Sequence, residues 1–231
     1  MPRTAVVAGV GPGLGASLAR RFVDEGCRVA LLARSEQFVS TLAADLGGDA
    51  LAVPTDISDP GAVAVAFEHV RERFGPVDVL VNNASGAAWA GIRDIDHDAF
   101  ADALAVGVEG ALYCSQEAVE DMLADDGGTI IFTGATSAVR GRDGAVGFSA
   151  AKFGARGLAE SMARELGPEG VHVAHVVIDG QIRPADPEER GRADETYLDP
   201  DAIAASYWDL VEQDRSAWTP ELDLRPHVEE F

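Results

Sequence analysis

The feature that most constrains the fold is a regular alternation of short Val, Ile, Leu and Ala runs with longer amphipathic segments. This alternation is typical of βαβ units, in which helices bury a parallel sheet on both faces. The short runs predict strands near Thr4–Ala8, Arg28–Ala33, Ala50–Val53, Val77–Val81, Thr129–Thr133 and Val171–Val177. The longer segments predict helices near Leu14–Glu25, Glu36–Leu46, Gly61–Phe74, Ala99–Leu123 and Phe148–Leu166. We therefore expect an α/β fold built on a doubly wound parallel sheet.

The 231 residues have the length and apolar content of one domain, so we expect residues 1–231 to form a single unit. The stretch from Gly180 to Pro200 is polar and rich in proline and acids, and it follows the last predicted core strand. In a doubly wound sheet this position lies at the carboxyl ends of the strands, so the stretch is expected to be a lid over a ligand. A short helix, Asp201–Glu212, and an aromatic tail over about residues 213–231 follow, and the tail could pack against the same subunit or another one.

A glycine-rich turn, Gly9-Val10-Gly11-Pro12-Gly13-Leu14-Gly15, follows the first predicted strand and opens the first helix. Glycines there permit a tight turn and let the backbone approach a pyrophosphate at a helix N-terminus. Alone, such a turn could be purely structural. Its place between strand and helix favours a dinucleotide-binding Rossmann fold, with Gly9, Gly11, Gly13, Leu14 and Gly15 at the cofactor.

Arg34 stands at the end of the second predicted strand, after Ala33. Folds of this kind that prefer NAD have a carboxylate there, about 20 residues after the turn, to hold the ribose hydroxyls. A guanidinium instead pairs with a 2′-phosphate through two hydrogen bonds, so the sequence favours NADP(H) over NAD(H). The alternative is that Arg34 only offsets neighbouring acids.

Two further motifs follow the third and fourth predicted strands: Asp56-Ile57, and Asn82-Asn83-Ala84-Ser85. With the glycine turn, they resemble the adenine-contacting pair and the Asn-Asn-Ala-Gly turn of the short-chain dehydrogenase/reductase family. The resemblance extends from about Thr4 to Ile182. It implies that Asp56 and Ile57 flank the adenine, that Asn83 and Ala84 pass beneath the adenosine ribose, and that the backbone of Ile182 contacts the carboxamide.

The segment Phe148-Ser149-Ala150-Ala151-Lys152 resembles the family's catalytic Tyr-x-x-x-Lys, with phenylalanine at the tyrosine, as in a divergent branch of the family. Lys152 is the only lysine in the chain, and the resemblance implies that it binds the nicotinamide ribose. The usual serine lies thirteen positions earlier, at Ala135, and Gly107 falls at the usual asparagine. A shift of one or two positions would bring Thr133, Thr136 or Ser137 to the serine's place.

Because phenylalanine has no ionisable group, a substitute proton donor must come from elsewhere. The candidates are Asp179, Tyr197, His175 and Ser149. Each also has a structural interpretation: Asp179 as a turn residue, His175 as a core histidine, Tyr197 as lid packing and Ser149 as helix packing. Trp89, after the Asn-Asn turn, could form a pocket wall or belong to the core.

The net charge of −21 opposes binding to nucleic acid or anionic lipid, so neither partner is expected. The acids are spread along the chain and lysine is nearly absent, a composition that resembles that of proteins from salt-accumulating microbes. If the chain is of this kind, low salt should promote its unfolding. No apolar run approaches the roughly 18 residues that span a bilayer, and no signal pattern precedes the first strand, so a cytoplasmic location is expected. Cys27 and Cys114 are expected to be core thiols without metal-ligand spacing, and no metal site is predicted.

Together these features favour an NADP(H)-dependent oxidoreductase acting on a small carbonyl or conjugated substrate. Transfer of hydride to a conjugated alkene or imine requires less help from an acid than reduction of a plain ketone, which suits the lost phenol. The alternative is a protein that senses NADP(H) and has lost turnover. The family resemblance implies a homodimer or homotetramer through the Ala99–Leu123 and Phe148–Leu166 helices.

Overall fold

The computed structural model describes residues 2–86, 88–189 and 191–228. Within them, seven strands form one sheet in the order β3-β2-β1-β4-β5-β6-β9, and every neighbouring pair is parallel. The strands are β1 (Thr4–Ala8), β2 (Arg28–Ala33), β3 (Ala50–Pro54), β4 (Val79–Asn82), β5 (Gly128–Thr133), β6 (Val171–Ile178) and β9 (Glu221–Leu224). The order reverses between β1 and β4, and ligands of such sheets bind at the carboxyl ends of the strands near that point.

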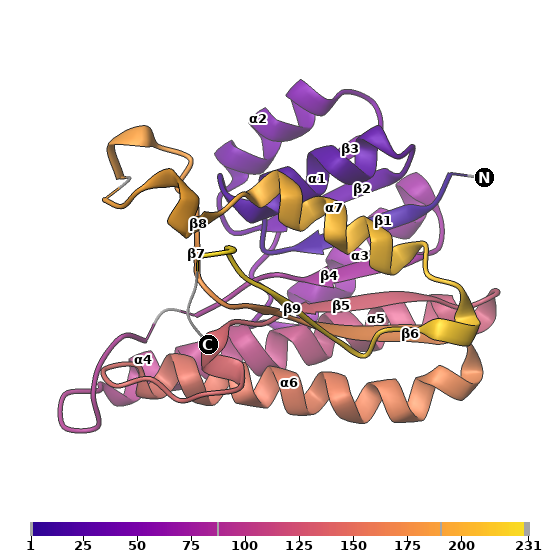
Figure 1. Ribbon diagram of the computed structural model, residues 1–231. Helices are drawn as coiled ribbons and strands as arrows, with labels where there is room; N and C mark the ends of the chain where they lie inside the picture. The colour runs from indigo at the N-terminus through magenta and orange to yellow at the C-terminus, as the bar shows by residue number, and fades with distance from the viewer. Residues whose placement is uncertain (1, 87, 190, 229–231) are drawn as a thin grey trace.

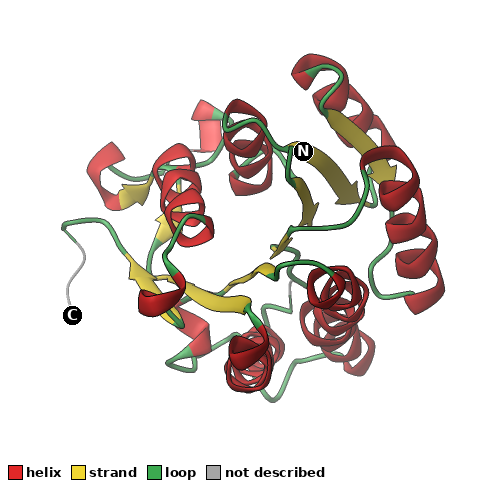
Figure 2. Cartoon of the chain, turned by 90° about the vertical axis from the view of Figure 1, so that its right-hand side faces the viewer, coloured by secondary structure: helices red, strands yellow, loops and turns green. Residues whose placement is uncertain are grey.

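Helices cover both faces of the sheet, as the sequence predicts (Figure 1). Alternate residues of β1 show why: Ala5 and Val7 join one apolar cluster, while Val6 and Ala8 join the other. The first cluster is closed by α1 (Leu14–Asp24), α2 (Glu36–Leu46) and α7 (Pro200–Val211). The second is closed by α3 (Pro60–Phe74), α5 (Gly110–Ala124) and α6 (Val146–Leu166). Figure 2 shows the two groups of helices on either side of the strands, which confirms the Rossmann-like arrangement.

The helix expected over Ala99–Leu123 differs from the expectation in its middle. The structure has α4 (His97–Leu104), a π-helical turn (Ala105–Glu109) and then α5. Gly107 lies in that turn, where a β-carbon would approach the Cβ of Ala151 in α6 to 3.1 Å. Such π turns are common at functional sites, and hydrophobic periodicity alone does not reveal one extra residue in a turn.

The stretch from Gly180 to Pro200 contains a small second sheet, in which β7 (Gln181–Ile182) pairs with β8 (Tyr197–Leu198). Two 3-10 turns, Pro187–Glu189 and Asp194–Thr196, lie between these strands. An ion pair between Arg183 and Asp199 joins the two ends of the stretch. Residue 190 of the expected lid lies outside the described residues.

The described part of the tail packs on its own chain. Trp218 stacks on His172 of β6 with ring centroids 5.0 Å apart, and β9 then extends the main sheet beside β6. Strand β9 was not predicted, because its alternation of acids and leucines is short. Residues 229–231 of the expected tail lie outside the described part of the chain.

The two cysteines are buried and unpaired, as expected for core thiols. Across residues 2–86, 88–189 and 191–228, no helix combines the length and apolar character that crossing a membrane requires.

Candidate cofactor and substrate site

Two adjoining pockets lie along the carboxyl edge of the sheet, and they share Gly9, Gly11, Asn83 and Ser85. One, of about 250 Å³, is lined by Arg34, Asp56, Ile57 and Ala84 in addition to the shared residues. The other, of about 320 Å³, is lined further by Gly13, Leu14, Gly15, Phe148, Lys152 and Ile182. Every residue that the sequence assigns to the cofactor therefore lines one of two connected pockets.

The glycines of the turn fall into two groups. A β-carbon on Gly9 would lie 2.3 Å from the backbone nitrogen of Ala84, and one on Gly15 would lie 2.7 Å from the carbonyl oxygen of Gly9. Gly9 also has a φ of +106°, which L side chains rarely adopt. A β-carbon on Gly11 or Gly13, in contrast, would meet no protein atom within 4 Å. Protein packing therefore explains glycine at 9 and 15, whereas Gly11 and Gly13 face open space that protein packing does not require.

The N-terminus of α1 is left open beside these glycines. Its N-cap residue is Gly13, which provides no capping side chain, whereas Ser35, Asp59, Asp96 and Asp199 cap α2, α3, α4 and α7. Backbone N–H groups at an uncapped helix start, together with the helix dipole, favour an anion. The turn thus has the geometry that a pyrophosphate requires.

A chain of hydrogen bonds supports the wall shared by the two pockets. The Asn83 amide donates from Nδ2 to the carbonyl oxygen of Gly9 at 2.7 Å and accepts at Oδ1 from Thr133 Oγ1 at 3.0 Å. The Tyr207 hydroxyl in turn donates to Thr133 Oγ1 at 3.0 Å. Tyr207 is fully buried, and burial raises the pKa of its phenol well above the ordinary value. It therefore supports the site as a neutral donor.

Sequence reasoning missed Tyr207. Its only sequence signal is a tyrosine on the apolar side of the Asp201–Glu212 helix, where a buried hydroxyl requires some partner. Nothing in the local pattern indicates that the partner is Thr133, 74 positions earlier in the chain.

Arg34 and Asp56 both line the smaller pocket. The Ser58 hydroxyl and backbone N–H both donate to Asp56, at 2.7 and 3.1 Å. These hydrogen bonds, with a smaller contribution from the Arg34 charge, lower the pKa of Asp56. Arg34 is exposed, and in the described part of the chain no acid lies within ion-pair distance of its guanidinium. It is therefore available to an anion at the pocket rim.

Lys152 is the one titratable side chain among the described residues that line the larger pocket. It is 7% exposed, its Nζ donates to the carbonyl oxygen of Thr133 at 2.7 Å, and it lies 5.7 Å from the Phe148 ring centroid. Burial lowers the pKa of its ammonium to about 8. A cation held this way can bind a ribose hydroxyl, and near neutral pH it can also release a proton.

A small cavity of about 10 Å³ lies beside Lys152. Its lining includes Asn82, whose Nδ2 donates to Ser115 Oγ, and Gly107 from the π-helical turn. Asn82 Oδ1 is buried without a hydrogen-bond partner among the described residues. The cavity is about the size of one water, which could bond to the free amide oxygen.

Three of the catalytic candidates line neither pocket: Thr136, Ser137 and Asp179. Thr136 donates from Oγ1 to Asp179 Oδ1 at 2.6 Å, and Asp179 also forms an ion pair with Arg225 at 3.3 Å. Ser137 is buried, and its hydroxyl has no partner in the described part of the chain. Ala135 does line the larger pocket, so the pocket wall follows the unshifted register from Phe148.

The other possible proton donors are also engaged elsewhere. His175 is buried in β6, with Nδ1 3.2 Å from Glu221 Oε2, and burial lowers its pKa. Its Nε2 has no partner within the described residues, so it is a core histidine with one nitrogen unsatisfied. Tyr197 is buried in β8, and Ser149 Oγ accepts a hydrogen bond from the backbone of Arg142 at 3.3 Å. None of the three lines the larger pocket.

Comparison with known proteins identifies the family. Residues 3–184 match the family described as short chain dehydrogenase, and the chain belongs to it. Meso-2,3-butanediol dehydrogenase of Serratia marcescens is 34% identical over 175 residues, which are 75% of this chain and 69% of the relative. Members of this kind are NAD(P)-dependent oxidoreductases.

Two similar crystal structures contain dinucleotides. The 3-ketoacyl-(acyl-carrier-protein) reductase of Brucella melitensis, complexed with NADH, has a TM-score of 0.88 and 25% identity, covering 97% of both chains. A metagenomic short-chain oxidoreductase in complex with NADP has a TM-score of 0.85 and 27% identity, covering 98% of each chain. Relatives of this fold therefore include proteins with either cofactor.

Proposed function

We propose that the chain is an NADP(H)-preferring reductase of a small carbonyl or conjugated substrate, with Lys152 at the nicotinamide ribose. The observation that carries this proposal is the pair of connected pockets, which contains all the expected cofactor residues. The open space at Gly11 and Gly13 fits a pyrophosphate, and Arg34, which has no acid partner in the described part of the chain, fits a 2′-phosphate. The bound cofactor would supply the hydride.

The residues of the two pockets would bind different parts of the cofactor. Arg34, Asp56 and Ile57 would hold the adenosine end, while the start of α1 faces the pyrophosphate. Asn83, fixed by Gly9 and Thr133, keeps the wall between them in place. Phe148 would exclude water from the reacting end, and Lys152 would orient the ribose through its ammonium.

Lys152, or a water beside it, is the proton source that the pocket lining favours. No other titratable side chain among the described residues lines the larger pocket, and the Lys152 pKa of about 8 permits proton release near neutral pH. A substrate with a conjugated alkene or imine places the least demand on such an acid.

The cofactor preference can be tested by titrating the parent protein and Arg34→Asp with NADPH and NADH in molar KCl. Removal of a charge-assisted pair and addition of a like charge should weaken NADPH binding about 100-fold and leave NADH within about threefold. Arg20→Asp is the matched control, because Arg20 is also exposed but lines neither pocket. Equal weakening of both cofactors would contradict the role of Arg34.

A non-catalytic NADP(H) sensor is the second candidate, favoured by the absence of a phenol at 148 and a serine at 135. NADPH oxidation across a panel of ketones, enones and imines separates the two. Tight NADPH binding without turnover at any salt concentration would support the sensor.

We also propose that the protein forms a homodimer or homotetramer through α4, α5 and α6. Phe153 of α6 is 44% exposed and Leu123 of α5 is 41% exposed, which suits a contact between copies. Light scattering in molar KCl would test this, and a monomer would contradict it.

A further inference from the structure

An aromatic and cationic surface lies next to the larger pocket. Trp89 stacks on Phe148 with ring centroids 4.4 Å apart and planes inclined by 24°, and the guanidinium of Arg142 lies 5.9 Å from the centre of the Trp89 ring. Phe148 is also part of the pocket lining, beside Lys152. We call Phe148, Trp89 and Arg142 the aromatic platform.

Backbone hydrogen bonds hold the two ring-bearing segments of the platform together. Val146 and Phe148, in the first turn of α6, donate their N–H groups to the carbonyl oxygens of Ala90 and Ala88, at 3.1 and 3.4 Å. Trp89 stands between these two acceptors. A β-carbon on Gly147 would lie 2.6 Å from the Cβ of Ala88, so glycine is required for this close approach.

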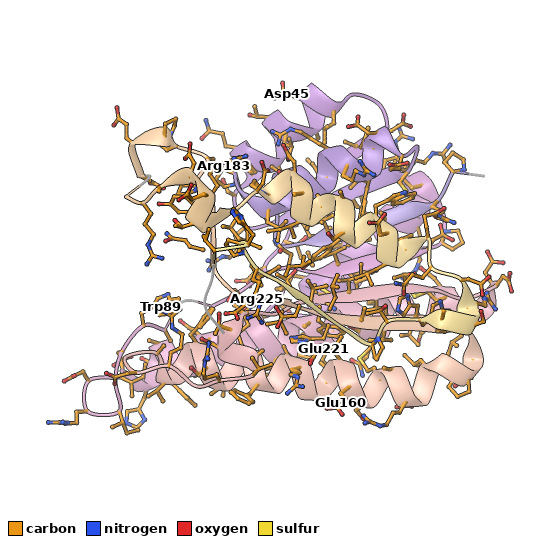
Figure 3. The ribbon with its side chains drawn as sticks, in the orientation of Figure 1. Asp45, Trp89, Glu160, Arg183, Glu221 and Arg225 are labelled. Carbon is orange, nitrogen blue, oxygen red and sulfur yellow. The ribbon has the colours of Figure 1, made fainter. Side chains whose placement is uncertain are left out.

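The Trp89 ring of the platform is nonetheless open to solvent. Trp89 is 57% exposed, although indole is a large apolar group that folding normally buries. Figure 3 shows Trp89 at the same end of the molecule as Arg183 and Arg225, where the strands of the sheet end. A ring exposed there is available to a molecule that reaches into the larger pocket.

Arg142 supplies the charge. Among the described residues no acid lies within ion-pair distance of Arg142, whereas Arg183 pairs with Asp199, and Arg225 pairs with Asp179 and Asp223. In a chain with a net charge of −21, an exposed arginine that has no acid partner among the described residues and lies against an exposed indole ring is a local site for an anion.

We propose that the aromatic platform selects a planar, conjugated substrate that bears a carboxylate. The conjugated plane stacks on the exposed Trp89 ring, which itself rests on Phe148, and the carboxylate pairs with Arg142. Phenylalanine at position 148 then supports the Trp89 ring by stacking, in addition to removing the usual proton donor from that position. This inference rests on the proposed reductase function and names its substrate class.

Three probes of similar size test the proposal by calorimetry in molar KCl, each titrated with and without saturating NADPH. They are trans-cinnamate, which is planar and anionic, trans-cinnamamide, which is planar and neutral, and 3-cyclohexylpropanoate, which is anionic and saturated. Stacking and pairing together predict that trans-cinnamate binds at least about tenfold more tightly than either of the others.

Two variants assign that preference to residues. Trp89→Leu should abolish the difference between trans-cinnamate and 3-cyclohexylpropanoate, and Arg142→Gln should abolish the difference between trans-cinnamate and trans-cinnamamide. Arg140→Gln is the control, since Arg140 is exposed two positions away and, among the described residues, lies over no aromatic ring. All three residues are exposed, so the variants should fold.

The outcomes separate the two proposals. NADPH binding without preference for the planar acid would overturn the platform and leave the reductase. Planar-acid binding that depends on Trp89 and Arg142, but no NADPH binding, would support the platform and overturn the reductase. A preference that survives in Trp89→Leu and Arg142→Gln would also overturn the platform.

Discussion

Substituting alanine for Gly9 and, separately, for Gly11 should divide the glycine turn into a structural part and a ligand-binding part. At Gly9 a methyl group would lie 2.3 Å from the Ala84 nitrogen, on a residue with φ of +106°. The backbone conformation costs about 1–2 kcal/mol for an L residue, and the overlap adds about 1–3 kcal/mol. Gly9→Ala should therefore lose about 3 kcal/mol of stability, or about 6–12 °C in Tm for a domain of this length.

At Gly11 the same methyl group would meet no protein atom within 4 Å, and φ lies outside the left-handed region. The free energy of unfolding without cofactor should change by less than about 1 kcal/mol, because alanine only makes the unfolded chain somewhat less flexible than glycine does. The methyl group would, however, project beside both pockets, because Gly11 lines each of them. We expect NADPH binding to weaken at least about tenfold, or 1.4 kcal/mol.

Urea unfolding in molar KCl, with and without NADPH, measures both effects. At a cofactor concentration 100 times the parent Kd, binding should stabilise the parent by about 2.7 kcal/mol, and a tenfold weaker variant by about 1.4 kcal/mol. Full NADPH stabilisation of Gly11→Ala would refute the argument that open space at that residue is kept for the cofactor. An unchanged stability of Gly9→Ala would refute the packing argument.

Three further predictions concern Lys152, Phe148 and the net charge. The lowered pKa of Lys152, about 8 against 10.5, means that the unfolded chain binds more protons between these values, so this group should add about 3 kcal/mol of stability as pH rises through that window. Lys152→Met should lack this gain when urea unfolding is measured as a function of pH. Burial also raises the thiol pKa of Cys27 and Cys114, but it does so in both proteins, so the difference between parent and variant reports Lys152 alone. Phe148→Tyr places a phenol near Lys152, so it should raise the rate of ketone reduction about 100-fold in an NADPH oxidation assay. A rate equal to that of the parent throughout pH 6 to 9 would contradict the alignment of Phe148 with the family's catalytic tyrosine. The Tm should rise between about 0.1 and 1 M KCl, because the Debye length falls from about 10 to 3 Å, and a Tm independent of KCl would contradict the salt-dependent stability expected of this acidic chain.

The sequence could predict the sheet and the cofactor pockets because both depend on short-range patterns. After their first residue, Thr4–Ala8 and Arg28–Ala33 are continuous apolar runs, and these two predicted strands match the observed β1 and β2 residue for residue. The glycine turn and Arg34 lie at the carboxyl ends of these strands, so parallel pairing of β1 and β2 is sufficient to bring them to one edge. Local pattern and chain topology together therefore bring the residues predicted for the cofactor to one edge of the sheet.

The rest could not be predicted because it depends on contacts between distant residues. The support of the pocket wall by Tyr207 requires α7 to pack against the sheet beneath Thr133, and no spacing in the sequence encodes that pairing. The Trp89–Phe148 stack depends on backbone hydrogen bonds between residues 88–90 and the start of α6. Sequence reasoning left Trp89 open between pocket wall and core. Its exposure excludes the core, and it lines neither of the two pockets.

Phenylalanine at position 148 is better understood together with these distant contacts than by itself. A tyrosine there would place its hydroxyl near the buried Lys152 ammonium, whereas phenylalanine leaves the cation 5.7 Å from an apolar ring. The same ring stacks on Trp89, which lies beside Arg142, an arginine without an acid partner among the described residues. Under our proposals, one substitution weakens proton donation and extends a flat surface for a conjugated substrate, which is the kind of substrate that needs the least proton donation. The two consequences point to the same chemistry, so a measured preference for planar acids and a low rate with plain ketones should occur together.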